Sequence, residues 1–166
     1  MPGTVIKRAA GVLLWALCPA LIASGQATSS GLTIRAVAEV ETRAMLDGRE
    51  TVRLTPEVRV VPGDEVLYTL EIRNIGRAAV RSPTVVNPVP AHMRYVADSA
   101  TGPGADVSYS VDGGETFNRP ENLEVIGANG QRRVAKPADY THIRWMLKNT
   151  LKSNSVAFAR FRAVVE

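Results

Sequence analysis

Two histidines, together with scattered serines and carboxylates, are the residues of this chain that are able to do acid–base or nucleophilic chemistry. His92 and His142 are the only histidines. A hydrolytic triad needs a histidine beside a nucleophile and a carboxylate, and neither histidine lies in a motif that marks a nucleophile. A zinc site needs several histidine or cysteine ligands. The sequence therefore predicts no catalytic residue, no cofactor and no metal centre, and we expect that the protein is not an enzyme.

The segment 110–117 has the pattern of an Asp-box, a hairpin motif that sialidase propellers carry several times. In this motif an aspartate accepts hydrogen bonds from backbone amides of a turn, and an aromatic side chain packs beneath it. The pattern occurs once here, in a chain too short for a propeller, so we interpret it as a structural hairpin and not as a sugar-cleaving site. The residues of this hairpin are Ser110, Asp112, Gly114, Thr116 and Phe117.

Calcium is a second interpretation of the same region. Asp112, Glu115 and Asp106 are the carboxylates that would bind it. Calcium requires six to eight oxygen ligands, and the loop lacks enough regularly spaced carboxylates. We therefore interpret these side chains as solvated turn carboxylates.

A small basic cluster is the one candidate for contact with a partner. Arg132, Arg133 and Lys136 fall in a region without strand periodicity, which predicts a long loop over residues 127–139. Such a cluster suits anionic polymers or phospholipid headgroups of a cell envelope, and the alternative is a solvated loop. No dense basic stripe is present, so we expect no nucleic-acid partner.

The first 27 residues have the order of a secretory signal peptide. Lys7 and Arg8 precede an apolar run over residues 9–23, and small residues follow. The run is shorter than the roughly 20 residues that span a bilayer. We expect cleavage after Ala27, with cleavage after Gly25 as the alternative. The protein is then exported to the periplasm, the cell surface or the medium, without a membrane span.

Removal of this segment changes the chemistry of the remaining chain. Cys18 is the only cysteine, so a chain that begins after Ala27 contains no thiol and no disulfide. Residues 28–166 contain 18 Lys and Arg against 16 Asp and Glu, a net charge of +2 instead of the +4 of the whole chain. Their length fits one domain.

The remaining sequence alternates apolar and polar residues with the period of β-strands. Turn signals such as Asp47-Gly48 and Asp112-Gly113-Gly114 separate the alternating segments. Segment 83–90 holds three prolines and is expected at a sheet edge, because proline cannot donate to a ladder. The pattern predicts an all-β sandwich of about seven to nine strands. The clearest strands cover residues 32–40, 66–72, 107–111, 143–147 and 155–165.

Several motifs together resemble a bacterial family, the domain of unknown function 11, also called the conserved repeat domain. They are Val-Pro-Gly-Asp at 61–64 with the strand that follows, Asn-Ile-Gly at 74–76, Asn-Pro-Val-Pro at 87–90, Ile-Arg-Trp at 143–145 and the strand at 156–165. The resemblance covers most of residues 55–166. The chain departs from the family in having one copy, Asn87 for an aspartate, and Lys152-Ser153-Asn154 for a proline-glycine turn.

The resemblance implies an immunoglobulin-like sandwich of the kind found in envelope and surface proteins, and it implies no activity. We therefore expect a non-catalytic structural or interaction module of the cell envelope, which binds another envelope component through loops or a sheet edge. The alternative is a small periplasmic hydrolase or a metal-binding protein. A cleft with paired acids, or with a histidine near an acid, would favour that alternative.

Overall fold

The chain folds into antiparallel β-structure, as the sequence predicts. The computed structural model describes residues 31–46, 49–56 and 59–166. The predicted signal peptide (residues 1–27), Cys18 and the Asp47-Gly48 turn lie outside the described residues. The described part contains ten strands and two single-turn 3-10 helices. No helix in these ranges has the length and apolar character needed to cross a membrane.

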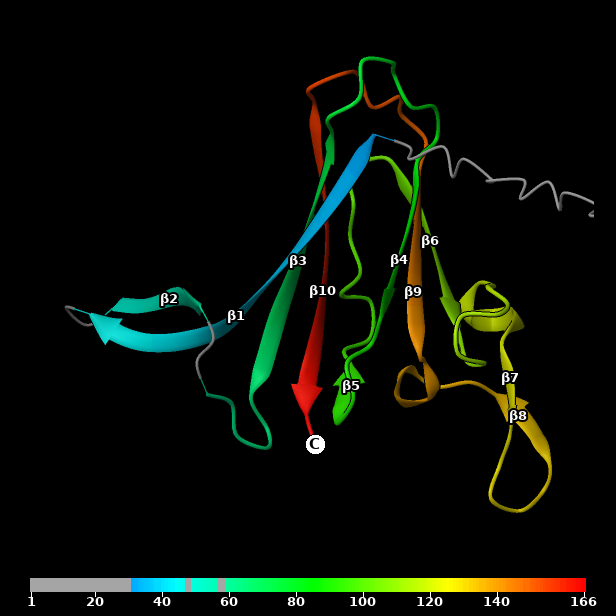
Figure 1. Ribbon diagram of the computed structural model, residues 1–166. Coiled ribbons are helices and arrows are strands. Elements are labelled where there is room, and N and C mark those ends of the chain that lie inside the picture. The colour runs from blue at the N-terminus through cyan, green and yellow to red at the C-terminus, as the bar shows by residue number, and fades with distance from the viewer. Residues whose placement is uncertain (1–30, 47–48, 57–58) are drawn as a thin grey trace, which may run out of the picture.

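Two sheets form the sandwich, and a two-stranded hairpin lies beside them (Figure 1). The larger sheet has the strand order β2-β1-β3-β10-β5 and the smaller sheet the order β4-β9-β6. The strands of the larger sheet are β1 (Leu32–Leu46), β2 (Arg49–Pro56), β3 (Glu65–Asn74), β5 (Met93–Tyr95) and β10 (Val156–Val165). The smaller sheet contains β4 (Thr84–Pro88), β6 (Ala105–Ser110) and β9 (His142–Leu147), and the hairpin pairs β7 (Glu124–Ile126) with β8 (Arg132–Val134).

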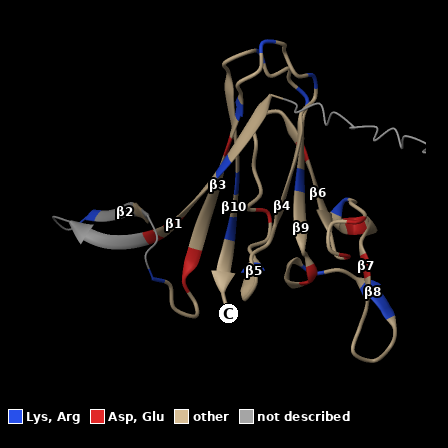
Figure 2. Cartoon of the chain, in the orientation of Figure 1, with Lys and Arg blue, Asp and Glu red and all other residues tan. Residues whose placement is uncertain are grey.

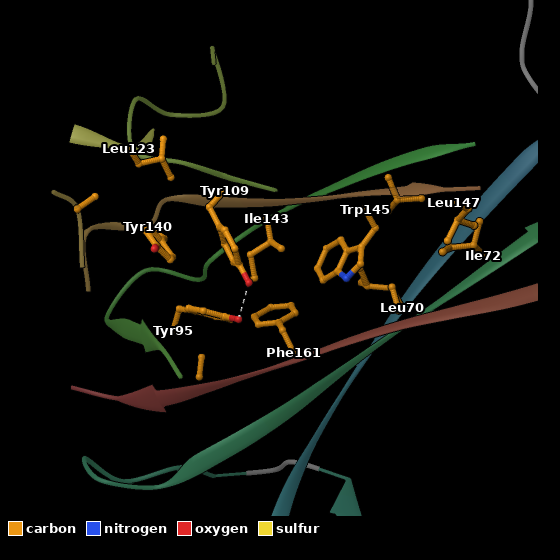
Figure 3. Packing of buried hydrophobic residues seen from close by; sticks show 14 of the residues in the cluster. Leu70, Ile72, Tyr95, Tyr109, Leu123, Tyr140, Ile143, Trp145, Leu147 and Phe161 are labelled. Carbon is orange, nitrogen blue, oxygen red and sulfur yellow. Dashed lines mark hydrogen bonds between the residues drawn. The ribbon is translucent and has the colours of Figure 1, made fainter. Parts of the chain in front are cut away.

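The core lies between β9 of the smaller sheet and the β3–β10 pair of the larger one (Figure 3). Trp145 on β9 is fully buried, which confirms the expectation from its place in an alternating strand. Its ring lies 6.0 Å from that of Phe161 on β10, centroid to centroid. Leu70 on β3 is also fully buried. Alternate residues of each strand point to one face. The apolar residues that recur with a period of two in the sequence therefore form this core layer.

One end of the core, on the left in Figure 3, contains three tyrosines. The hydroxyls of Tyr95 and Tyr109 are hydrogen-bonded at 2.9 Å, and the ring of Tyr140 stacks on Tyr109 at 4.6 Å. The Tyr95 hydroxyl also accepts the backbone N–H of Ala100. Burial, with the Tyr95 hydrogen bond as a second cause, raises the pKa of Tyr109 far above its usual value. The Tyr109 hydroxyl therefore stays protonated at neutral pH and keeps its hydrogen bond with Tyr95.

A buried asparagine closes the opposite end of the larger sheet. The Asn74 side chain, fully buried, donates to the carbonyls of Ala78 and Leu151 at 2.9 Å each and accepts the N–H of Gly76 at 3.0 Å. Gly31 lies against the same turn, where an added β-carbon would come within 2.5 Å of the Gly76 α-carbon. The Asn-Ile-Gly motif thus ties the start of β1, the end of β3 and the β9–β10 connection together.

The β9–β10 turn contains a residue with a positive φ. Asn154 adopts a φ of +59°, in the left-handed region that asparagine tolerates better than most residues. Its N–H donates to the carbonyl of Asn74 at 2.8 Å. Lys152-Ser153-Asn154 therefore forms a reversal in which asparagine takes the left-handed conformation.

Strand β1 is confirmed, but its apolar face is not buried along its whole length. Ile34 pairs with Ile72 of β3, yet Ile34 is 52% exposed and Ile72 is fully buried. The smaller sheet has three strands against five in the larger one, and it does not extend over β1. The far part of β1 and its partner β2 extend to one side of the sandwich as an arm (Figure 1).

The expectation of a structureless loop over residues 127–139 is wrong. Strand β8 pairs with β7 in this region, and a 3-10 turn (Pro137–Asp139) follows. The sequence pattern does not indicate strand β8, because all three of its residues are exposed. The proline-rich segment is as predicted, since β4 lies at an edge of the smaller sheet and pairs only with β9.

Replacing Trp145 with alanine tests the core. The truncation leaves a large cavity between the sheets, and we expect it to cost about 3–5 kcal/mol of unfolding free energy. Urea denaturation of the wild type and the variant measures the loss. Met146→Ala is the matched control, because the neighbouring Met146 side chain is 45% exposed and its truncation should cost less than about 1 kcal/mol. Equal losses for the two variants would contradict the assigned core.

Candidate functional site

The predicted hairpin residues meet in one hydrogen-bonded turn after β6. The Asp112 carboxylate accepts the Ser110 hydroxyl at 2.6 Å and the Thr116 N–H at 3.0 Å. The Ser110 oxygen in turn accepts the N–H of Gly114 at 2.9 Å, and Gly114 has a φ of +92°. Hydrogen bonds from Ser110 and then Thr116 hold the pKa of Asp112 far below its usual range. These contacts are those of a turn stabilised by a carboxylate.

The aromatic residue of this motif leaves the turn and packs over the outer face of the smaller sheet. The guanidinium of Arg144 on β9 lies 4.5 Å from the centre of the Phe117 ring. This is a cation–π contact. The hairpin therefore fixes an aromatic ring beside an arginine of the central strand.

Ser110, His142 and Asp112 are close in the fold, but their contacts are not those of a hydrolytic triad. The buried Ser110 hydroxyl donates directly to the Asp112 carboxylate. The His142 ring instead lies within 3.2 Å of the Thr141 hydroxyl and stacks near Gly114. In a triad the serine hydroxyl is bonded to the imidazole. His92 lies elsewhere, in the turn before β5, with a φ of +62°.

Two of the carboxylates considered for calcium, Asp112 and Asp106, already have other partners. Asp112 is occupied by the turn, and Asp106 forms an ion pair with Lys148 at 2.8 Å. Within residues 31–46, 49–56 and 59–166, no group of three or more His, Cys, Asp or Glu is placed to hold a metal ion. The geometry thus offers calcium no ligand set in the described chain.

The predicted basic cluster is spread over β8 and the turn that follows, next to acidic residues (Figure 2). Arg133 forms two hydrogen bonds to Asp139, at 2.6 and 2.8 Å. Arg132 reaches Glu124 on β7 at 3.4 Å. Lys136 contributes its backbone N–H to Asp139 at 2.6 Å. The three residues lie on one hairpin and its following turn, and the charge of Arg133 is largely neutralised by its own partner.

The Arg133–Asp139 pair gives a pH-dependent prediction. The hydrogen bond from Arg133 is the main cause that lowers the pKa of Asp139 to about 2. Because the folded pKa is depressed, the stabilisation is present above the unfolded value of about 3.9 and is lost as the pH falls towards 2. We expect Arg133→Gln to return the Asp139 pKa towards 3.9, measured by carboxyl-carbon NMR. Arg132→Gln is the control, and an unchanged Asp139 pKa in Arg133→Gln would show that the pair does not form.

An apolar groove at the edge of β10 was not predicted from the sequence. The groove has a volume of about 390 Å³, and Phe158 on its rim is 44% exposed. Pro103, Leu147 and Leu151 line it as well. A possible signal was present in the sequence, since Phe158 falls on the polar side of the alternating pattern of the last strand. The groove is built from three separate stretches, so its existence depends on the fold.

Comparison of the chain with protein-family models, with curated proteins and with solved structures gave no match.

Proposed function

We propose that this protein is an exported, non-catalytic module of the bacterial cell envelope, which binds another envelope component at a sheet edge. Export is supported by the basic, apolar and small order of the first 27 residues. The envelope is supported by the family resemblance, whose motifs include the buried Asn74 turn. The fold itself, a sandwich with a filled core, is one that hosts many functions, so the argument for binding depends on a particular surface.

The observation that carries the proposal is the open edge of β10 beside the apolar groove. Alternate residues of a strand direct their backbone groups to opposite neighbours. Arg160 exchanges two backbone hydrogen bonds with Thr101 at 2.8 Å each, on the side away from β3. Phe158 is the next residue that faces this side. Within the described chain its backbone N–H and carbonyl have no strand partner there, because β5 pairs only with residues 163–165.

An open edge of this kind is a template for a further strand. Proteins usually blunt exposed edges with charges, prolines or bulges, as the prolines next to β4 do. At Phe158 the edge adjoins an apolar groove, which Pro103 helps to line, and an exposed aromatic ring. In β-augmentation an added strand gains affinity from backbone hydrogen bonds and specificity from side-chain pockets. The partner we propose is therefore an extended apolar segment of another envelope protein.

Site-specific crosslinking in the producing cell tests this function. A photoreactive amino acid at position 158 is expected to capture one defined envelope protein, identified by mass spectrometry. The matched control is position 86, because Val86 on the smaller sheet is also 44% exposed. Crosslinks of the same kind and yield at both positions, or none at 158, would overturn the proposed edge contact.

A charge at the same place gives a second prediction. Phe158→Glu places an unpaired carboxylate on the proposed apolar interface, and we expect recovery of the partner in pull-downs to fall at least about tenfold, the equivalent of about 1.4 kcal/mol. Val86→Glu should leave recovery unchanged. Tryptophan fluorescence and urea denaturation establish that both variants are folded, so a loss that appears equally in both would contradict a specific role of the edge.

Export has its own measurement. The intact mass of protein isolated from the envelope or the medium is expected to match a chain that begins at Thr28, or at Gln26 for the alternative cleavage. A titration with a thiol reagent should find no cysteine, because Cys18 lies in the removed part. A full-length mass beginning at Met1 in this fraction would show that no cleavage occurs.

A further inference from the structure

The outer face of the smaller sheet contains a cavity that is separate from the edge of β10. Its volume is about 230 Å³, and it lies against β6 and β9 beside segment 117–119. Ser108, Phe117, Arg119 and Arg144 are among the residues that line it. None of them lines the groove at Phe158.

Long-range pairing brings these residues together. The backbones of Asn118 and Tyr109 exchange two hydrogen bonds at 2.9 Å, which lays segment 117–119 alongside β6. The Tyr109 ring points into the core and is 7% exposed. Because side chains alternate along extended backbone, Phe117 and Arg119 on either side of Asn118 face outward. There they line one cavity with Arg144, whose register partner on β6 is Ser108.

Arg144 is held in a fixed direction. Its Nε donates to the Ser108 hydroxyl at 3.0 Å, and its guanidinium lies over the Phe117 ring at 4.5 Å. These contacts use the Nε and one face of the guanidinium, and they leave the two terminal nitrogens as donors. Among the described residues, no hydrogen bond or ion pair to these nitrogens is found. The side chain is therefore positioned in advance to receive an acceptor.

Arg119 adds a second guanidinium to the same cavity. Its backbone N–H is tied to the Asn118 side-chain oxygen at 3.0 Å, and its guanidinium likewise has no partner within the described part of the chain. The one carboxylate in the lining belongs to Asp106, which is neutralised by Lys148 at 2.8 Å. Two positive charges thus line a small cavity without a counter-charge of their own.

We propose that this cavity binds a phosphate monoester group, held by Arg119 and the terminal nitrogens of Arg144. A phosphate monoester carries about −1.5 to −2 charges and three acceptor oxygens, which matches two guanidinium groups. A carboxylate carries one charge and two oxygens, and a single arginine fork saturates it. The cavity is smaller than the roughly 300–1,000 Å³ pockets of drug-sized ligands, so it takes the charged group and leaves the rest of the molecule outside.

Phosphate-bearing envelope molecules can present this group either in soluble form or on a lipid surface. The inference does not depend on the proposed edge contact, because the two sites share no residue. A protein with both sites would hold a protein segment at one sheet edge and a phosphate at the outer face of the other sheet.

Isothermal titration of the chain beginning at Thr28 with glycerol 3-phosphate, at constant ionic strength, is the first test. We expect one saturable site, and we expect Arg119→Gln to weaken it about tenfold through the loss of charge-assisted hydrogen bonds. Arg132→Gln is the control, because the Arg132 side chain is 78% exposed on β8 and does not line the cavity. Equal binding by Arg119→Gln and Arg132→Gln would overturn the proposal.

Three further measurements test the proposal. Arg144→Lys retains the charge but loses the planar fork. We expect this variant to weaken glycerol 3-phosphate binding, while circular dichroism shows that its fold is intact.

We expect that acetate does not compete with glycerol 3-phosphate for the site. Competition by acetate at the same concentration as glycerol 3-phosphate would overturn the choice of phosphate. Vesicles of phosphatidic acid in phosphatidylcholine distinguish the two sources of the phosphate group. If the protein binds these vesicles and Arg119→Gln weakens that binding, the group belongs to a lipid. If the protein binds only glycerol 3-phosphate, the group belongs to a soluble molecule. Failure of both probes to bind contradicts the site.

Discussion

The contact of Trp145 with the β3–β10 pair is the interaction on which the two-sheet arrangement depends. The smaller sheet has three strands, and its central strand β9 supplies the side chains that fill the space above Leu70 and Phe161. Buried aromatic side chains contribute most to such cores because they remove a large apolar area from water. The Trp145 Nε1 has no hydrogen-bond partner among the described residues. Packing against Phe161 is thus the contact that the described residues give the ring.

The limited width of the smaller sheet also determines which surfaces stay exposed. It covers β3, β10 and the tyrosine cluster, and it leaves Ile34 of β1 in solvent. On the opposite side, β5 is three residues long and pairs with only the end of β10, which leaves the edge at Phe158 open. Ile34 is therefore exposed because the smaller sheet is narrow, whereas the Phe158 side chain is exposed because it lies on the outward face of β10. Neither results from an unusual local conformation.

Much of the sandwich could be predicted because its strands are half-buried and alternate clearly. Trp145 and the 156–165 strand are examples, since a period of two in long segments distinguishes strand from helix. Strand β8 was missed because Arg132, Arg133 and Val134 are all exposed and carry no burial pattern. The sequence could not predict that Arg119 and Arg144 line one cavity, because this depends on the pairing of Asn118 with Tyr109 and of β6 with β9.

The burial of Trp145 also gives the molecule an optical property. The sequence contains two tryptophans, and the other one, Trp15, lies in the segment expected to be removed on export. A chain that begins at Thr28 therefore has one indole, which is fully buried at the junction of the two sheets. Emission from such an indole is shifted to the blue and moves to the red when water reaches it. The intrinsic fluorescence of such a chain thereby reports whether the two sheets are in contact.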